Sequence, residues 1–190
     1  EPLSGGNLKW GEGVKSAYFA QHQFEALPLE ESIYNLISHE NPKWLVTEVR
    51  TYLGSFLFSG ETVDKKIKVL SGGEVSRLAL AKMLSTPSEL ILLDEPTNHL
   101  DMRSRDVVQE AIASFTGSMV CISHDRHFLN AVTNTIIEVD QGRIRIFPGN
   151  YEYYLWRKNQ DQIEKSERPE KTAKVTSQKS ANTDYHLRKK

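Results

Sequence analysis

Apolar residues recur at helical spacing on both sides of Pro42, within residues 29–58. Positions three and four apart share one face of a helix, so this pattern predicts two helices. Gly54 and Gly60 end the segment, because glycine is a poor helix former. The residues expected to face inward are Leu29, Ile33, Leu36, Ile37, Leu45, Val49, Tyr52 and Leu53.

A third helix is predicted to begin after Ser71-Gly72-Gly73 and to stop before Pro87, because proline cannot continue a helix. A fourth is expected from about Arg103 to Phe115, and a short fifth near Phe128–Val132. The buried face expected for the third helix consists of Val75, Leu78, Ala79, Met83 and Leu84.

Two continuous apolar runs, Leu90–Leu93 and Met119–Ile122, are flanked by polar residues. Such runs are typical of strands buried on both faces, as in a parallel sheet. Residues 7–20 alternate and predict one or two further strands joined at Gly11-Glu12-Gly13. Strands that alternate with helices indicate an α/β fold. The last two strands expected, around Gln141-Gly142, are Thr135–Val139 and Arg143–Phe147.

The composition suits a soluble globular protein. Of 190 residues, 38% are apolar and 26% are charged, which is ordinary for such a protein. No apolar stretch approaches the length of a membrane span and no signal peptide opens the chain, so we expect a cytoplasmic protein without a membrane partner. The single cysteine, Cys121, lies in an apolar run and is interpreted as a small buried hydrophobe.

The net charge of −1 conceals a basic tail. Residues 157–190 hold ten Lys and Arg against five Asp and Glu, a formal charge of +5, so the preceding residues carry −6. Residues 166–184 are rich in Ser, Thr, Lys, Glu and Gln, a composition that predicts disorder. A basic tail behind an acidic body fits a nucleic-acid partner. A solvated linker explains the same composition.

The most informative chemistry follows the first apolar run. Asp94 and Glu95 end the strand predicted at Leu90–Leu93, and ligands of open α/β sheets sit at the carboxyl ends of strands. An Asp there can hold Mg²⁺ through water, and a neighbouring Glu can orient and deprotonate a water that attacks phosphate. The plainer alternative is an acidic turn at a strand end.

Two other sites carry weaker signals on their own. Leu70-Ser-Gly-Gly-Glu74 puts two glycines before a helix, where backbone N–H groups can bind phosphate, although Ser71 alone is also an ordinary N-cap. His124, in Ser123-His-Asp-Arg126, follows the second buried strand. A lone histidine is more often a structural hydrogen bonder than a catalyst.

The two stretches together resemble the motifs of an ATP-binding cassette. The run Asp94-Glu-Pro-Thr-Asn-His-Leu-Asp101 is similar to the Walker B motif and D-loop, and Leu70–Glu74 is similar to the signature loop. Asn98-His99 resembles the ABC-F branch, as do Leu53–Gly60 and Gly149–Tyr154. ABC-F proteins lack membrane domains and act on ribosomes.

The resemblance implies a role for each motif residue. Asp94 would bind Mg²⁺, Glu95 would activate water, and His124 would be the switch histidine that contacts the γ-phosphate. Gln21 resembles the glutamine that lies near Mg²⁺ and the attacking water, with Gln23 as the alternative. The residues expected to contact ATP are Gln21, Ser71, Gly72, Gly73, Glu74 and Asp101, with the signature residues serving a nucleotide held by an opposing cassette.

One motif of the family is missing from the sequence. The phosphate-binding loop G-x-x-x-x-G-K-[ST] occurs nowhere. Gly11-Glu-Gly-Val-Lys-Ser16 is a decoy, because Val14 separates the glycine from Lys15 and a predicted strand follows instead of a helix. We therefore expect a P-loop NTPase-like cassette cut at its amino-terminal side, although a naturally degenerate protein has the same sequence.

The expected organisation is a partial cassette over residues 1–156, with a mostly parallel sheet and a helical subdomain at about 24–86, then a charged tail at 157–190. That tail is either disordered or the start of a coiled-coil extension, which favours the second cassette of an ABC-F protein. We expect an ATPase that uses ATP and Mg²⁺, pairs with a second cassette of the same chain and contacts the ribosome or RNA. The alternatives are a transporter subunit and a non-catalytic cassette that completes an ATP site in trans.

Overall fold

The computed structural model describes residues 5–20 and 27–166, with side chains through Glu164. Gln21 and Gln23 therefore lie outside the described residues, as does most of the charged tail. The chain divides into two compact units, Glu1–Val132 and Thr133–Lys190, and each is described by itself.

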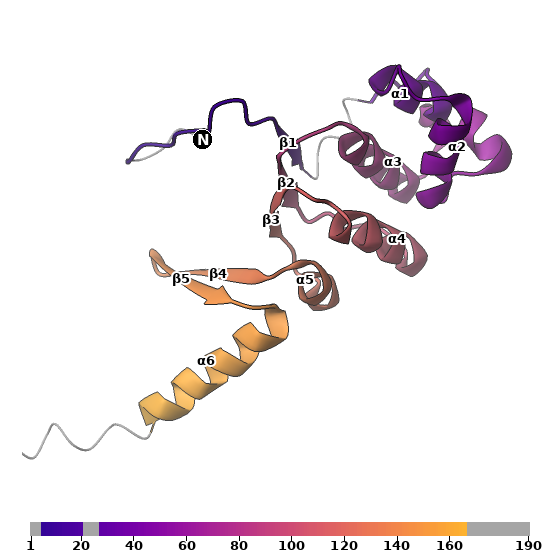
Figure 1. Ribbon diagram of the computed structural model, residues 1–190. Coiled ribbons are helices and arrows are strands. Elements are labelled where there is room, and N and C mark those ends of the chain that lie inside the picture. Colours follow the sequence, from indigo (N-terminus) through magenta and orange to yellow (C-terminus); the bar gives the residue numbers. More distant parts are fainter. Residues whose placement is uncertain (1–4, 21–26, 167–190) are drawn as a thin grey trace, which may run out of the picture. The chain divides into compact units, whose positions relative to one another are not determined.

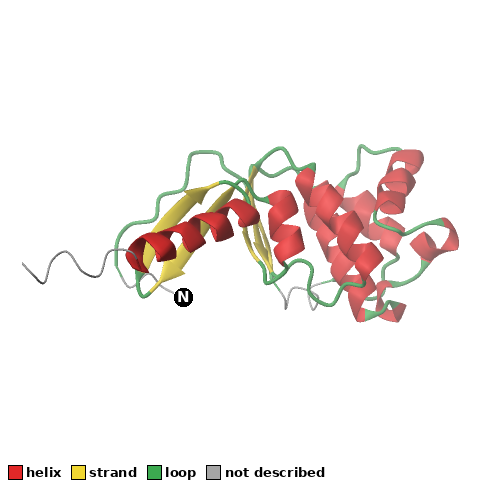
Figure 2. Cartoon of the chain, turned by 90° about the horizontal axis from the view of Figure 1, so that it is seen from below, coloured by secondary structure: helices red, strands yellow, loops and turns green. Residues whose placement is uncertain are grey.

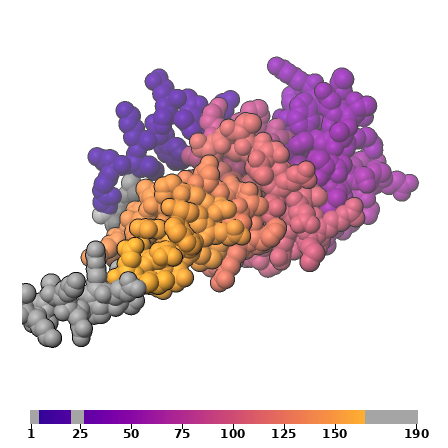
Figure 3. Space-filling model, turned by 60° about the horizontal axis from the view of Figure 1, so that its bottom comes forward, coloured from indigo at the N-terminus to yellow at the C-terminus, as the bar shows by residue number. Residues whose placement is uncertain are grey.

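A three-stranded parallel sheet forms the centre of the first unit (Figure 1). Its strands are β1 (Ser16–Phe19), β2 (Leu90–Asp94) and β3 (Ser118–Ile122), in the order β1-β2-β3. Ser16 pairs with Leu90, which in turn pairs with Ser118. The expected α/β fold with a parallel sheet is confirmed. Only one strand forms in the stretch 7–20, and residues 5–16 are exposed and extend outward (Figure 3).

Helices α3 (Gly72–Ser85), α4 (Met102–Ala113) and α5 (Arg126–Val132) pack with the sheet around one hydrophobic cluster. β2 contributes Ile91 and Leu93, the two side chains of that strand that are almost completely buried. The other buried members come from the helices, the preceding strand and the turn after β2: Phe19, Leu80, Leu100, Val108, Ile112 and Phe128.

A second cluster lies within the helical segment, between α1 (Ile33–Glu40), α2 (Val46–Ser55) and the opposite side of α3. Two short 3-10 turns, η2 (Gly60–Asp64) and η3 (Ile67–Val69), join it. The two predicted helices are confirmed. Their buried residues are Ile33, Leu36, Ile37, Val49 and Leu53. Other buried members of the cluster are Leu27, Phe56, Phe58, Val63, Ile67, Leu78 and Ala81.

The structure corrects three burial predictions. Leu29 and Leu45 are exposed because Leu29 precedes α1 and Leu45 is the N-cap of α2. β3 is not buried on both faces: Val120 is 53% and Ile122 is 64% exposed, because they lie on the sheet face opposite to Met119 and Cys121, which pack with the helices. Helix α3 is buried on two sides instead of one. Of the face predicted for it only Leu78 is buried, whereas Val75, Ala79, Met83 and Leu84 are half-buried, and the other buried residues are Ser76, Arg77, Leu80, Ala81 and Ser85.

The second unit is a hairpin with one helix beside it (Figure 2). β4 (Thr135–Asp140) and β5 (Arg143–Pro148) are antiparallel. Gln141 and Gly142 both have positive φ, 46° and 74°, as the two-residue turn of a right-twisted hairpin requires. Helix α6 (Tyr151–Ser166) continues ten residues past the boundary expected at 156. It packs on the hairpin through a Phe147–Tyr154 ring contact at 5.0 Å between centroids.

Charged groups also join α6 to the hairpin. Lys158 and the Tyr154 hydroxyl both donate to the Glu138 carboxylate, and Arg145 pairs with Asp161. These partners hold the pKa of Glu138 below its ordinary value, with the hydrogen bond from Lys158 as the largest cause.

The other face of the hairpin carries exposed apolar side chains. Ile137 pairs across the strands with Ile146, and Val139 pairs with Ile144. All four are between 57% and 72% exposed. A contiguous apolar patch of this kind favours association and dye binding.

Replacing both Ile137 and Ile146 by threonine should reduce association and dye binding through the apolar patch. Threonine keeps the β-branch, so the free energy of unfolding should change by no more than about 0.5 kcal/mol. We expect lower fluorescence of a hydrophobic-surface dye and a larger soluble fraction. In contrast, Phe147→Thr removes the buried ring beneath α6 and should destabilise the unit. Unchanged dye binding in the double variant would show that the dye binds at another surface.

Candidate functional site

The loop before α3 is held by a reciprocal pair of hydrogen bonds. Ser71 is the N-cap, and its hydroxyl accepts from the Glu74 backbone N–H at 3.4 Å. The Glu74 carboxylate accepts from the Ser71 backbone N–H and hydroxyl, each at 2.8 Å. This capping box satisfies backbone groups that the first turn of a helix leaves without partners. The bond from the Ser71 backbone is the largest cause that lowers the pKa of Glu74.

Gly72 and Gly73 form the first turn of this 14-residue helix. Amide groups there point outward along the axis, at the positive end of the helix dipole, and suit an anion. Gly72 has open space beside it, whereas a Cβ on Gly73 would lie 3.1 Å from the His99 backbone oxygen. Glycine at position 73 therefore allows the start of α3 to approach the turn that contains His99.

Asp94 and Glu95 lie where the sheet ends. The Glu95 backbone N–H donates to the Ile122 carbonyl at 2.9 Å, so the pairing with β3 continues one residue past the strand. Glu95 has φ of 50°, a left-handed conformation that costs free energy for a residue with a Cβ. The Asn98 backbone N–H donates to the Glu95 carbonyl and closes the turn.

Glu95 and His124 are brought together from the ends of two neighbouring strands. The His124 backbone N–H donates to Glu95 Oε2 at 3.3 Å, and His124 Nε2 lies 3.6 Å from Glu95 Oε1. Glu95 Oε1 is buried and has no hydrogen-bond partner among the described residues, whereas the His124 side chain is 97% exposed. The oxygen can accept a proton from a bound water, and the exposed imidazole can contact a ligand beside it.

The turn after β2 ends in the cap of α4. Asp101 is the N-cap, and its carboxylate accepts from the Ser104 backbone N–H at 2.9 Å and the Ser104 hydroxyl at 2.8 Å. These bonds lower the pKa of Asp101, and the bond from the Ser104 backbone N–H is the largest cause. Its carboxylate is therefore engaged in holding the turn, and a nucleotide contact from it stays a prediction.

Arg105 connects this turn to the loop of His124. Its Nε donates to the Leu100 carbonyl at 3.1 Å, and its Nη1 lies 3.7 Å from an Asp125 oxygen. Asp125 also accepts from the His127 and Phe128 backbone N–H groups at the start of α5. Sequence reasoning missed these residues. The spacing Asp101-x-x-Ser104 and Asp125-x-x-Phe128 is an N-cap signal, but nothing in the sequence marks Arg105.

The structure thus brings Asp94, Glu95 and His124 to the carboxyl edge of the sheet. It places the Ser71–Glu74 loop next to the turn at His99. Lys15 lies at the opposite end of the strands, where its backbone N–H donates to Glu89 at 2.7 Å. It precedes strand β1, not a helix, so the strand predicted to follow the decoy loop is confirmed.

No group of three or more His, Cys, Asp or Glu side chains gathers within the described ranges. That does not conflict with magnesium, which takes one or two carboxylates and fills its other positions with water and substrate phosphates. That Asp94 supplies such a carboxylate stays a prediction. The buried Glu95 oxygen without a hydrogen-bond partner suits a water.

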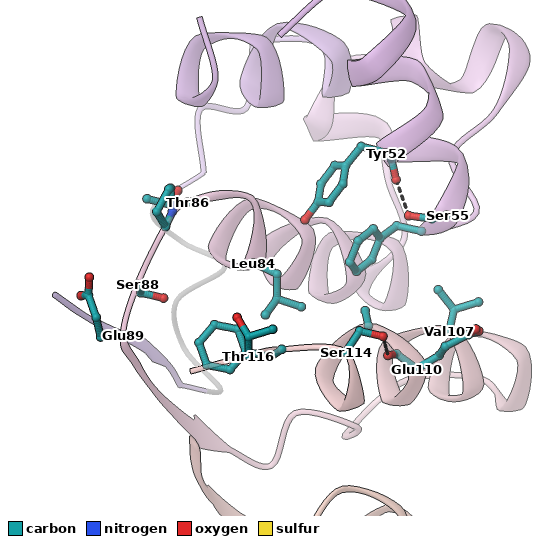
Figure 4. A pocket seen from close by; sticks show the side chains of 14 residues that line it. Tyr52, Ser55, Leu84, Thr86, Ser88, Glu89, Val107, Glu110, Ser114 and Thr116 are labelled. Carbon is teal, nitrogen blue, oxygen red and sulfur yellow. Dashed lines mark hydrogen bonds between the residues drawn. The ribbon is translucent and has the colours of Figure 1, made fainter. Parts of the chain in front are cut away.

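A cavity of about 630 Å³ lies elsewhere in the first unit (Figure 4). Tyr52 of α2, Leu84 of α3 and Val107 of α4 line it. It reaches Glu89, just before β2 begins, so it opens toward the end of the sheet opposite to Asp94. None of the predicted site residues in the described part of the chain lines it, and the candidate site is instead the surface around the strand ends.

Comparison with known proteins gives consistent sequence matches. A family model described as ABC transporter matches residues 9–98. The chain is 38% identical over 161 residues to ABC transporter F family member 5 of Arabidopsis thaliana, covering 85% of this chain and 23% of that protein. It is 40% identical over 153 residues to the protein YheS of Escherichia coli (strain K12), covering 80% and 24%. The chain thus spans about a quarter of the length of these curated relatives.

Solved structures share the fold. An archaeal ribosome recycling factor, aABCE1, crystallised with the ribosomal stalk protein aP1, has a TM-score of 0.63 at 22% identity, with 87% of this chain and 32% of that chain covered. The ATP-binding cassette MJ0796, solved as a dimer with ADP and Pi, has a TM-score of 0.57 at 22% identity, with 71% and 63% covered. Among the described helices, none has the length and apolar character needed to cross a membrane.

The capping box at Ser71 can be tested by stability. Ser71→Ala should lower the free energy of unfolding by about 1 kcal/mol, whereas Glu74→Gln should keep the box at neutral pH because glutamine also accepts from the N-cap. The matched control is Ser59→Ala, since Ser59 makes no side-chain cap bond.

The contribution of Glu74 to the free energy of unfolding should depend on pH. Because its pKa is lowered in the folded state, its stabilisation is present above the unfolded pKa of about 4.3. It is lost as the pH falls through the folded value. Denaturant titrations should therefore show that the wild-type chain loses more stability than Glu74→Gln as the pH is lowered through this range. Parallel losses in the two proteins would contradict this.

Proposed function

This chain belongs to the ATP-binding cassette proteins of the ABC-F type, and we propose that it is the carboxyl-terminal cassette of a cytoplasmic ABC-F ATPase that acts on the ribosome. The observation that carries the proposal is the Glu95–His124 pair at the carboxyl edge of the sheet. The proposal for the second cassette position is supported by α6 and the basic residues that follow it.

The reaction is the attack of water on the γ-phosphate of ATP, which gives ADP and phosphate. Glu95 Oε1 accepts a hydrogen bond from the attacking water and takes its proton as the new P–O bond forms. His124 donates to the γ-phosphate oxygens, where negative charge increases. Asp94 and Gln21 would hold Mg²⁺, which would supply charge neutralisation at the phosphates.

The loop Ser71–Glu74 serves a different nucleotide, one held by a second cassette of the same protein. The support is its geometry: Ser71 and Gly72 are exposed, and the start of α3 directs free amide groups outward. The Ser71 hydroxyl now donates to Glu74 and turns to donate to the γ-phosphate on binding. The basic charge of residues 157–190 supports contact with ribosomal RNA.

In the full-length protein, Glu95→Gln should abolish phosphate release while ATP binding persists, because glutamine is isosteric but cannot take the proton of the water. We expect kcat to fall by a factor on the order of 100 or more with a smaller change in KM. The matched control is Glu89→Gln, a carboxylate at the other end of β2, which should keep the wild-type rate. The measurement is steady-state phosphate release with ATP binding followed separately.

The alternatives appear as distinct outcomes of the same assay. Normal hydrolysis in Glu95→Gln together with loss of hydrolysis in Ser71→Arg would identify a non-catalytic cassette that completes a site in trans. Co-purification with a membrane-spanning protein would instead favour a transporter subunit.

The 190-residue chain alone should bind ATP weakly and not hydrolyse it, because these residues contain no G-x-x-x-x-G-K-[ST] loop to hold the β- and γ-phosphates. Binding to the folded state raises the melting temperature only when the ligand exceeds its Kd. Millimolar ATP with Mg²⁺ should therefore leave the melting temperature unchanged. A clear rise, with phosphate release that Glu95→Gln abolishes, would contradict this expectation.

A further inference from the structure

Arg77 is an unusual residue for the interior of the first unit. It lies on α3, one turn after Gly73, and only 7% of it is exposed. Its Nη1 donates to the Ser104 hydroxyl on α4, and its guanidinium lies 4.7 Å from the centre of the Phe58 ring. One cationic side chain of α3 thus contacts both the helical segment, through Phe58, and the beginning of α4, through Ser104.

Ser104 passes this contact on to the turn after β2. Its hydroxyl accepts from Arg77 and donates to an Asp101 carboxylate oxygen at 2.8 Å, while its backbone N–H donates to the other oxygen at 2.9 Å. Ser104 is 1% exposed. A hydrogen bond with an ionised partner is stronger than a neutral one. The series of hydrogen bonds from Arg77 through Ser104 to Asp101 has a cation at one end and a carboxylate at the other.

Stability alone gives a poor account of a buried arginine here. Burial lowers the pKa of Arg77, against the attraction of Asp101 and Glu74, and its Nε is buried without a hydrogen-bond partner among the described residues. Replacing a buried ionic group by an apolar one of similar volume is often neutral or stabilising. The interaction therefore calls for a role other than adding stability.

Its geometry supplies that role. The start of α3 is fixed at two points about one helical turn apart: Gly73 lies against the His99 carbonyl, and Arg77 reaches the Ser104–Asp101 cap. The hydrophobic core holds the axis of α3 from both sides. The two contacts additionally fix the first turn of the helix against the Asn98–Asp101 turn, and hence the direction of the Ser71 hydroxyl and the Gly72 N–H relative to that turn.

We propose that Arg77 is a positioning residue that locks the Ser71–Glu74 loop to the Asn98–Asp101 turn, so that both face the opposing nucleotide as one rigid element. This rests on the proposed function, in which the loop binds a γ-phosphate. Arg77 acts through Ser71 and Gly72 and does not touch the nucleotide itself.

The test uses steady-state kinetics of the full-length protein. Arg77→Met fills the space without the hydrogen bond, and we expect kcat to fall on the order of tenfold, the effect of losing one charged hydrogen bond, with little change in KM. Arg77→Lys keeps the charge and should recover part of kcat. Because both residues act through one loop, adding Arg77→Met to Ser71→Ala should lower kcat less than additivity predicts.

The matched control is Val108→Ala, a fully buried position on α4 outside this hydrogen-bond chain. It should lower the melting temperature yet keep kcat at temperatures where the protein is folded. A kcat for Arg77→Met equal to that of Val108→Ala, or full additivity with Ser71→Ala, overturns the inference. If Arg77→Met does not fold, Ser104→Ala breaks the same chain and must lower kcat in the same way; a wild-type kcat then overturns it.

The proposed role of the Ser71–Glu74 loop can be tested separately from the role of Arg77. Ser71→Arg places a bulky cation in the loop and should abolish hydrolysis. Wild-type hydrolysis in Ser71→Arg rejects the role of the loop itself. Loss of hydrolysis in Ser71→Arg with a normal rate in Arg77→Met rejects only the positioning role of Arg77.

Discussion

The packing of α3 between two hydrophobic clusters is the constraint on which the first unit depends. Leu78 and Ala81 belong to the cluster of the helical segment, and Leu80 belongs to the cluster against the sheet. A helix buried on two sides cannot tilt without opening both interiors, since protein interiors are closely packed. The exposed loop at its beginning therefore inherits a fixed position from the core, although it makes few contacts of its own.

Much of the fold was predictable from apolar spacing, because that spacing follows directly from the geometry of helices and strands. The five helices predicted up to Val132 and the paired strands around Gln141-Gly142 all form. The errors share one cause: spacing reports which residues are apolar, not what covers them. Val120 and Ile122 are as apolar as Ile91 and Leu93, yet they lie on the opposite face of the sheet, away from the cluster that buries Ile91 and Leu93.

The candidate site was predictable to a different degree. The motif residues Asp94, Glu95 and His124 follow two strands that the sequence assigns to a parallel sheet, with ligands at its carboxyl edge. The structure pairs these two strands and brings Glu95 and His124 together. The supporting residues were not predictable. Arg77, Ser104 and Arg105 act through contacts between elements, and a side chain that bridges two helices has no periodic signal in either. The left-handed backbone of Glu95 is also a tertiary effect, set by its bond to Ile122 and the turn to Asn98.

The register of the sheet also carries a consequence for how the chain acquires its structure. Ser16 of β1 pairs with Leu90 of β2, so a long intervening segment must be closed into a loop before these two strands can pair. Such non-local pairing slows folding, whereas the hairpin β4–β5 and α6 use neighbouring residues. On a ribosome that synthesises the chain from its amino terminus, β1 cannot pair with β2 until β2 has emerged. The helical segment between them is free to collapse first, and by shortening the distance between the two strands it assists the pairing that completes the sheet.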